Sequence, residues 1–135
     1  MLKELLLATA LLSPVSPPSI VRGFEPPVSA FGPGHRGVDY AAVLGQPVRS
    51  PLAGVVTFVG RINDRSVVTV TSGGMQLSME PVLATVRIGD VIAAGEVIGN
   101  VGPGGHCALR CVHLGIRIDG AYVDPSMSRR RLLPY

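Results

Sequence analysis

Glycine and proline occur along almost the whole chain, and this feature constrains the fold more than any other. The 135 residues include 17 glycines and 12 prolines, about a fifth of the chain, where average usage is about 12%. Helical bundles do not tolerate breakers at this density, whereas short strands joined by tight turns do. The length fits one domain, and a hydrophobic content of 47% excludes a disordered chain. We therefore expect a single all-β domain.

Residues 111–118 have the clearest strand pattern in the chain. Apolar and other side chains alternate there, so one face is expected to enter the core and the other to stay outside it. The expected core positions are Val112, Leu114, Ile116 and Ile118. The opposite face carries Cys111, His113, Gly115 and Arg117. This placement favours a functional site over a packing role for His113.

Three further segments have the composition of strands. Residues 48–59 are strand-like, and Pro51 is expected to confine their first half to an edge or a bulge. The β-branched run 66–71 leads into Ser72-Gly73-Gly74, which is typical of a hairpin turn, and residues 75–79 are expected to pair back. These segments predict small antiparallel sheets.

The two ends of the chain differ in composition from its middle. Residues 1–18 combine a basic start, an apolar run and a Ser-Pro break, which indicates a secretory signal peptide followed by a linker. Residues 128–135 form a basic tail. Between them, residues 19–127 make the expected domain, exported to the cell envelope or the extracellular medium. No other run approaches the roughly 18 apolar residues of a spanning helix, so no stable membrane span is expected.

The residue types that are missing exclude several functions. Lys3 is the single lysine, which argues against a Schiff-base lysine, a P-loop lysine or a lysine that carries biotin or lipoate. Tryptophan is absent, and three tyrosines and three phenylalanines are the only aromatic residues. A stacking platform for nucleic acid is therefore not expected.

The chain has three histidines, and two of them combine with a carboxylate in a pattern that suits a metal ion. His35 and Asp39 are four residues apart, so their side chains share a face in an extended segment, and the small Gly37 between them leaves room for an ion. With His113 from the distant strand they make three nitrogen and oxygen ligands, the number that a catalytic zinc uses beside water. The His-x-x-x-Asp spacing alone is a weak signal.

Four separately spaced motifs follow one another along the chain. Residues 34–60 (GHRGVDYAAVLGQPVRSPLAGVVTFVG) contain a His-x-Gly-x-Asp stretch, then Pro-Val, then Ala-Gly-x-Val. Residues 78–102 contain glycine-punctuated steps, residues 111–117 read CVHLGIR, and residues 122–125 read Tyr-Val-Asp-Pro. Together these motifs resemble the lysostaphin-like, or LytM-type, zinc peptidases. The resemblance implies an all-β core of small antiparallel sheets, sandwich-like and built on a duplicated hybrid motif.

The resemblance also implies roles for particular residues. It makes His35, Asp39 and His113 the zinc ligands. Glu80 stands where the family usually has the histidine of its Tyr-x-His motif, and Cys111 stands where it has the first histidine of His-x-His. Those two family histidines assist the attacking water and stabilise the tetrahedral intermediate. The Glu-Pro and Cys-x-His pattern is similar to a branch of the family from high-GC bacteria.

Some residues near these motifs keep more than one interpretation. Glu80 is either a general base toward water or an exposed carboxylate at a strand end. Cys111 forms a disulfide with Cys107, closes the site as a fourth thiolate ligand, or is a free thiol; a pair of cysteines in an exported chain favours the disulfide. His106 is either a loop histidine without a role or a substitute for a missing catalytic histidine.

The function expected from this resemblance is a zinc-dependent metalloendopeptidase that acts, as a monomer, on peptide bonds of bacterial peptidoglycan. The alternative is a degenerate, non-catalytic domain of the same type that binds cell wall or regulates another cell-wall hydrolase. A biotinyl or lipoyl carrier domain has similar glycine-punctuated steps, but the lack of an internal lysine argues against it.

Overall fold

The structure is a computed structural model that describes residues 11–26 and 34–125. Residues 1–10 of the expected signal peptide, and the basic tail 128–135, lie outside this part of the chain. No helix long and apolar enough to cross a membrane occurs in the described segments. Their strands are β1 (Ile20–Arg22), β2 (Val38–Ala41), β3 (Pro47–Arg49), β4 (Gly54–Ile62), β5 (Arg65–Ser72), β6 (Met75–Glu80), β7 (Val82–Ala84), β8 (Val91–Ile92), β9 (Val97–Val101), β10 (Cys111–Ile118) and β11 (Ala121–Val123).

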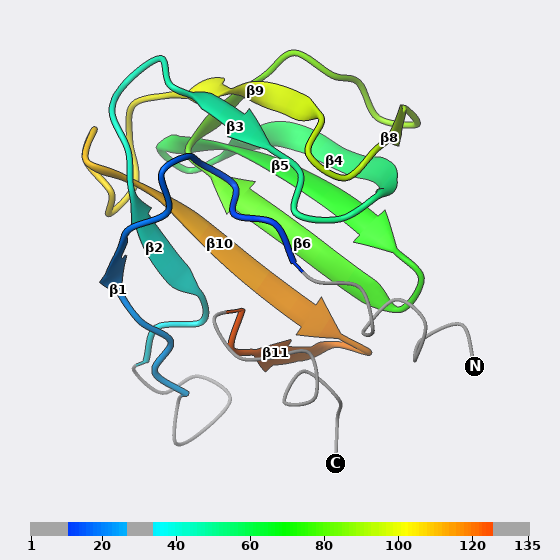
Figure 1. Cartoon of the computed structure of the whole chain (residues 1–135), viewed down its shortest axis with the longest axis horizontal. Helices are drawn as coiled ribbons and strands as arrows, with labels where there is room; N and C mark the ends of the chain where they lie inside the picture. The colour runs from blue at the N-terminus through cyan, green and yellow to red at the C-terminus, as the bar shows by residue number, and fades with distance from the viewer. Residues whose placement is uncertain (1–10, 27–33, 126–135) are drawn as a thin grey trace.

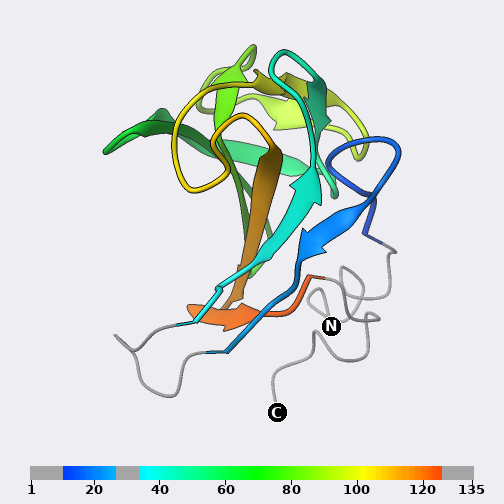
Figure 2. The same ribbon diagram turned by 90° about the vertical axis from the view of Figure 1, so that its left-hand side faces the viewer.

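These strands form two antiparallel sheets. The large sheet has the order β1-β2-β10-β6-β5-β4-β8, and β11 pairs with the last part of β10. Strands β10, β6 and β5 run side by side through the middle of the molecule (Figure 1). The small sheet has the order β3-β9-β7 and lies at the top of the view in Figure 2, above the long strands. The all-β architecture of small antiparallel sheets is therefore confirmed.

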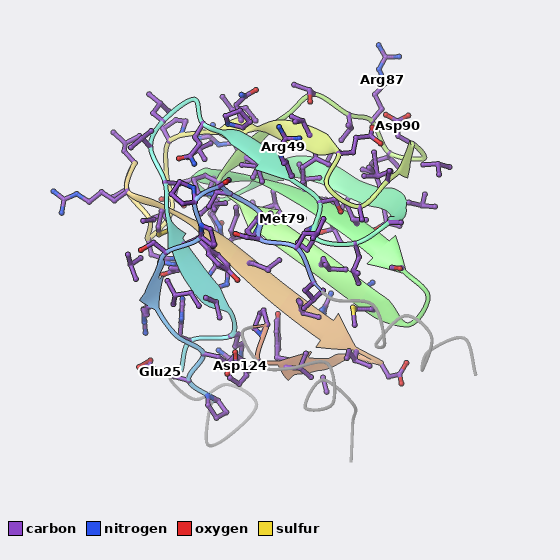
Figure 3. All side chains as sticks on the ribbon, in the orientation of Figure 1. Glu25, Arg49, Met79, Arg87, Asp90 and Asp124 are labelled. Carbon is purple, nitrogen blue, oxygen red and sulfur yellow. A yellow bond between two sulfur atoms is a disulfide. The ribbon has the colours of Figure 1, made fainter. Side chains whose placement is uncertain are left out.

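Burial along β10 follows the alternation of its sequence. The predicted core face is confirmed, because its four apolar side chains are at most 1% exposed: Val112, Leu114, Ile116 and Ile118. They pack with apolar residues of the neighbouring strands, among them Leu77 and Met79 of β6. Met79 lies near the centre of the fold (Figure 3). Fully burying a side chain of this size contributes roughly 1.5–3 kcal/mol, so this face holds β10 firmly in place.

Residues 48–59, predicted as strand-like with an edge or a bulge in their first half, form two strands that belong to different sheets. Strand β3 ends just before Ser50, and β4 begins at Gly54. Pro51 has no amide hydrogen with which to continue a strand ladder. The Ser50 amide donates instead to the carbonyl oxygen of Glu96 at 2.9 Å. The chain therefore leaves the small sheet at this proline and enters the large one.

The hairpin between β5 and β6 has the predicted glycine turn. Gly73 and Gly74 form its two-residue loop, and Gly73 adopts a φ of 61°. The hairpin between β4 and β5 turns at Asn63, with a φ of 55°, and it was not predicted from the sequence. Asparagine is one of the few residues other than glycine that enter the left-handed region readily, but without a glycine beside it the turn signal is weak.

The predicted linker lies against the domain. Val15 is 2% exposed and belongs to the hydrophobic core. Just beside it, the carbonyl oxygen of Pro14 accepts a hydrogen bond of 2.8 Å from the amide of Arg49 in β3. Residues ahead of position 19 therefore pack with the domain that was expected to begin there.

Candidate metal centre

The candidate site lies where β2 and β10 pair within the large sheet. Asp39 of β2 stands directly opposite His113 of β10 in the antiparallel register. His35 lies just ahead of β2, where backbone hydrogen bonds of 2.8 and 2.9 Å join it to Glu25. Strand pairing thus brings together Asp39 and His113, which are 74 residues apart in sequence.

Four polar side chains converge at this point, with Asp39 at their centre. The Nδ1 of His113 lies 2.7 Å from Asp39 Oδ1, and the Nε2 of His35 lies 3.2 Å from the same oxygen. The Nε2 of His106 lies 3.0 Å from Oδ1 and 2.9 Å from Oδ2. One donor atom from each of the four residues falls within 4.8 Å of every other, so the group can hold one metal ion.

The environment of His35 determines which of its two nitrogens faces the cluster. Its Nδ1 donates a hydrogen bond of 2.8 Å to the carbonyl oxygen of Gly23, because a carbonyl oxygen only accepts. In the neutral ring, Nε2 therefore carries the lone pair. This nitrogen is fully buried and has no hydrogen-bond partner in the described part of the chain, although Asp39 Oδ1 is 3.2 Å away. Two acceptors that face each other repel unless a cation lies beside both, so these residues fit a metal ion.

Asp39 supplies the negative charge of the cluster. Burial by itself raises the pKa of this carboxyl group, but hydrogen bonds from His113 and His106, and the positive charge these rings carry when protonated, lower it from 3.8 to about 2. Asp39 is therefore ionised at neutral pH. A carboxylate combined with imidazole nitrogens is a ligand set that zinc accepts.

His106 reaches the site from a loop, whereas the other two histidines lie on or beside strands. Its side chain is 44% exposed, against 5% for His35 and 14% for His113. A disulfide between Cys107 and Cys111 connects this loop to the first residue of β10. Of the three interpretations of Cys111, the structure has the disulfide, so its sulfur is not a free thiolate.

Glu80 lies beside the cluster and is paired with an arginine. It ends β6, directly opposite His113 in the register of β6 and β10. Its Oε1 accepts a hydrogen bond of 3.2 Å from the Nε of Arg65. The carboxylate is 18% exposed and lines a groove that His113 also lines, but it is not one of the four grouped donors.

Gly37 has a different role from the one its position suggests. The sequence indicates that it leaves room for an ion between His35 and Asp39. In the structure, a Cβ at Gly37 would overlap the carbonyl oxygen of Leu114 and lie 2.5 Å from His113 Nε2. The space is therefore occupied by the backbone of β10 and the ring of His113, and Gly37 permits the close approach of these two segments.

Most members of this cluster carry a sequence motif, whereas the groups that support them do not. His35, Asp39 and His113 come together as the resemblance implies. His106 is the fourth member of the cluster, and Glu80 is not a member. The carbonyl oxygen of Gly23 leaves no signal in the sequence, because every residue has one. Arg65 likewise carries no motif, and only its pairing with Glu80 across the sheet reveals its position.

Comparisons with known proteins show the family to which this chain belongs. The family model described as Peptidase family M23 matches residues 33–125, well over half of the chain. An uncharacterized protein of Mycobacterium tuberculosis is 42% identical over 116 residues, which cover 81% of this chain and 47% of the relative. DD-carboxypeptidase/endopeptidase Mpg of Neisseria meningitidis is 36% identical over 93 residues, 67% of this chain and 22% of that protein. The chain thus spans less than half the length of these relatives.

Solved structures share the fold. A zinc-containing peptidase from Vibrio cholerae superposes with a TM-score of 0.76 at 22% identity, over 88% of this chain and 40% of its own. The solution structure of lysostaphin superposes with a TM-score of 0.65 at 23% identity, over 76% of this chain and 44% of its own. With its antiparallel sheets, its His and Asp cluster and the family match, this chain belongs to peptidase family M23, the lysostaphin-like metallopeptidases.

Proposed function

We propose that this chain is a zinc-dependent metalloendopeptidase that hydrolyses peptide bonds of bacterial peptidoglycan. The observation that carries the proposal is the buried Nε2 of His35, which has no hydrogen-bond partner among the described residues and faces the Asp39 carboxylate. An unsatisfied buried polar atom costs about 1–3 kcal/mol, and a bound cation removes this cost. Two imidazoles and a carboxylate are also the number and kind of ligands that a catalytic zinc takes.

In this proposal, His35, Asp39 and His113 hold the zinc through Nε2, a carboxylate oxygen and Nδ1. When bound, zinc would act as a Lewis acid that polarises the scissile carbonyl group and lowers the pKa of a water molecule in the site. The hydrogen bond from His35 to the carbonyl oxygen of Gly23 orients the imidazole ring. Partners of this kind fix the tautomer of histidine ligands in metal sites.

Two further residues are proposed to transfer protons. His106 is the stronger candidate, because its ring lies at the open side of the cluster and imidazole both accepts and donates a proton. Glu80 is the weaker candidate, because its Oε1 already accepts a hydrogen bond from Arg65. Both residues lie close to His113, where the substrate would bind. Glu80 is opposite His113 in the strand register, and His106 and His113 both contact Asp39.

The name of one relative supports the proposed reaction, and the disulfide supports the proposed location. The Neisseria relative carries the name DD-carboxypeptidase/endopeptidase, which is an activity on peptide bonds of the kind proposed here. We place the protein outside the cytoplasm, in the cell envelope or the extracellular medium, as a monomer. The disulfide between Cys107 and Cys111 agrees with this compartment, because disulfides persist where the surroundings are oxidising.

A non-catalytic role in binding cell wall or regulating another hydrolase is the second candidate. Two positions that the resemblance assigns to catalytic histidines carry other residues in this chain. Glu80 is paired with Arg65, and Cys111 is bonded to Cys107. In this alternative the metal would shape a surface that binds peptide without cleaving it.

Zinc content and peptide release from purified sacculi distinguish the two candidates. The proteins to compare are wild type, His35→Ala and Glu80→Gln. We expect bound zinc and peptide release for wild type and neither for His35→Ala. Glutamine keeps the shape of glutamate but accepts no proton, so equal rates for Glu80→Gln and wild type would exclude Glu80 as the base. Zinc and sacculus binding by wild type without any release would favour the non-catalytic role.

A further inference from the structure

Arg117 is a cation in the groove that begins at the candidate metal centre. It lies on the same face of β10 as His113, and only Gly115 separates them on that face. Its guanidinium carbon is 5.7 Å from the centre of the Tyr122 ring, a cation–π contact that holds the side chain over β11. Among residues 11–26 and 34–125, no carboxylate forms an ion pair with it.

The groove that contains Arg117 has room for an extended peptide. Its volume is about 500 Å³, and it crosses the outer face of β4, β5, β6 and β10. Its lining is mixed: Ser78 and Thr69 are joined through their hydroxyl groups at 2.8 Å, Gly115 presents no side chain, and apolar residues of β4 and β5 lie beside them. The polar groups of this lining can bond the backbone of a peptide.

The charges that line the groove are unequal. Its walls include Arg36, Arg65 and Arg117, whereas Glu80 is the only carboxylate among the described lining residues. Glu80 and Arg65 neutralise each other, and Arg65 also donates to the carbonyl oxygen of Ile62 at 3.3 Å. Arg117 therefore adds a positive charge to the groove, and no carboxylate of the described residues engages its hydrogen-bond donors.

We propose that Arg117 determines substrate specificity by binding a free carboxylate of the peptide, four residues along the strand from the metal ligand His113. The role in substrate specificity rests on the proposed function, whereas the binding of a carboxylate by Arg117 does not. A rise of about 3.3 Å per residue places the two Cα atoms roughly 13 Å apart, so the carboxylate lies about four extended residues from the bond that is cleaved. The guanidinium fork matches a carboxylate in two parallel hydrogen bonds.

Binding of three five-residue alanine peptides with the same N-terminal dye tests this role by fluorescence anisotropy. One peptide has a free C-terminal carboxylate, one has a C-terminal amide, and one has the amide and a glutamate in place of its fourth alanine. We expect wild type to bind both carboxylate peptides about tenfold more tightly than the plain amide, because each carboxylate would form one charge-assisted hydrogen-bonded pair with Arg117. A gain limited to one of them identifies whether Arg117 binds a terminal or a side-chain carboxylate.

Two matched variants assign this preference to Arg117. Arg117→Gln should bind all three peptides equally, and Arg117→Lys should recover part of the preference because it keeps the charge without the fork. Arg87→Gln removes the same charge from a side chain that extends away from the molecule, and it should bind as wild type does (Figure 3). With cleavable peptides, Arg117→Gln should raise KM about tenfold and leave kcat unchanged.

Equal binding of all three peptides by wild type, no measurable binding of any of them, or an equal loss in Arg87→Gln would overturn the role of Arg117. These outcomes are distinct from failure of the proposed function. A preference for carboxylates that depends on Arg117, found together with no cleavage of any peptide or sacculus, would contradict the enzymatic proposal and leave the carboxylate site intact.

Discussion

The two halves of the candidate metal centre are built differently, although they meet at one carboxylate. His35, Asp39 and His113 come from a pair of hydrogen-bonded strands and the residues beside them, and all three are largely buried. His106 comes from an exposed loop that the Cys107–Cys111 disulfide connects to β10. Groups on paired strands keep their positions whether or not a ligand is bound, whereas a group on a loop can adjust. We infer that the strand half (His35, Asp39 and His113) holds the metal and that the loop half (His106) acts on the substrate.

Removing a strand ligand should have the largest effect on metal binding. We expect His113→Ala to lower zinc affinity by more than about 100-fold, because loss of even an outer partner of a ligand typically costs 10- to 100-fold. Elemental analysis after dialysis measures this. His106→Ala is the matched control and should keep about one zinc per chain. Loss of zinc from both variants would mean that His106 is a fourth ligand and that the two halves do not differ.

Removing the loop histidine should have its main effect on turnover. If His106 serves the reaction, His106→Ala should lower the rate of peptide release by about 100- to 1,000-fold, the typical cost of losing one group that stabilises the transition state. Arg110→Ala, on the same loop and outside the cluster, is the control and should keep the wild-type rate. An unchanged rate in His106→Ala would reduce this residue to a loop histidine without a role.

A methyl group at the contact between β2 and β10 should strain the strand half. Gly37→Ala forces a Cβ against the carbonyl oxygen of Leu114 and the ring of His113. We expect the free energy of unfolding to fall by about 1–3 kcal/mol, the usual cost of overpacking. Gly23→Ala adds the same methyl group where no atom lies within 4 Å and should change stability little. Urea denaturation of both variants gives the comparison, and equal stability would contradict the close packing at Gly37.

Opening the disulfide should have the smallest effect, and that effect should be confined to the loop half. Chain entropy predicts that a bridge with a sequence separation of 4, as between Cys107 and Cys111, stabilises the fold by about 2 kcal/mol at most. The double variant Cys107→Ser with Cys111→Ser should keep its zinc and release peptide more slowly than wild type. Intact-mass analysis after alkylation without reductant checks the bridge itself, and two alkylated thiols in the wild-type protein would show that it is absent.

Much of the fold follows from local sequence signals. The alternation of apolar residues at positions 111–118 predicts both the limits and the core face of β10, because a strand alternates its side chains regardless of its neighbours. The two glycines after Ser72 predict the β5–β6 hairpin for a similar reason. At Pro51 the sequence predicted an edge or a bulge, and the structure has a break between two strands of different sheets. A proline indicates that regular pairing is interrupted, but it does not indicate which sheet the next strand joins.

For the site, the sequence by itself determined the residue types and the spacing of His35, Asp39 and His113, because periodicity and motif resemblance are local properties of the chain. Only the tertiary structure decided how the remaining residues are used. Because β6 pairs with β5, Glu80 forms an ion pair with Arg65. The loop before β10 approaches β2, so that His106 contacts Asp39. The register of β2 with β10 leaves no room for a side chain at Gly37. The contacts of His106 and Gly37 join segments that are distant in sequence, and no local pattern specifies which distant segment a side chain will meet. The β5–β6 hairpin is a local feature, but its turn signal does not specify which side chains of the two strands form an ion pair.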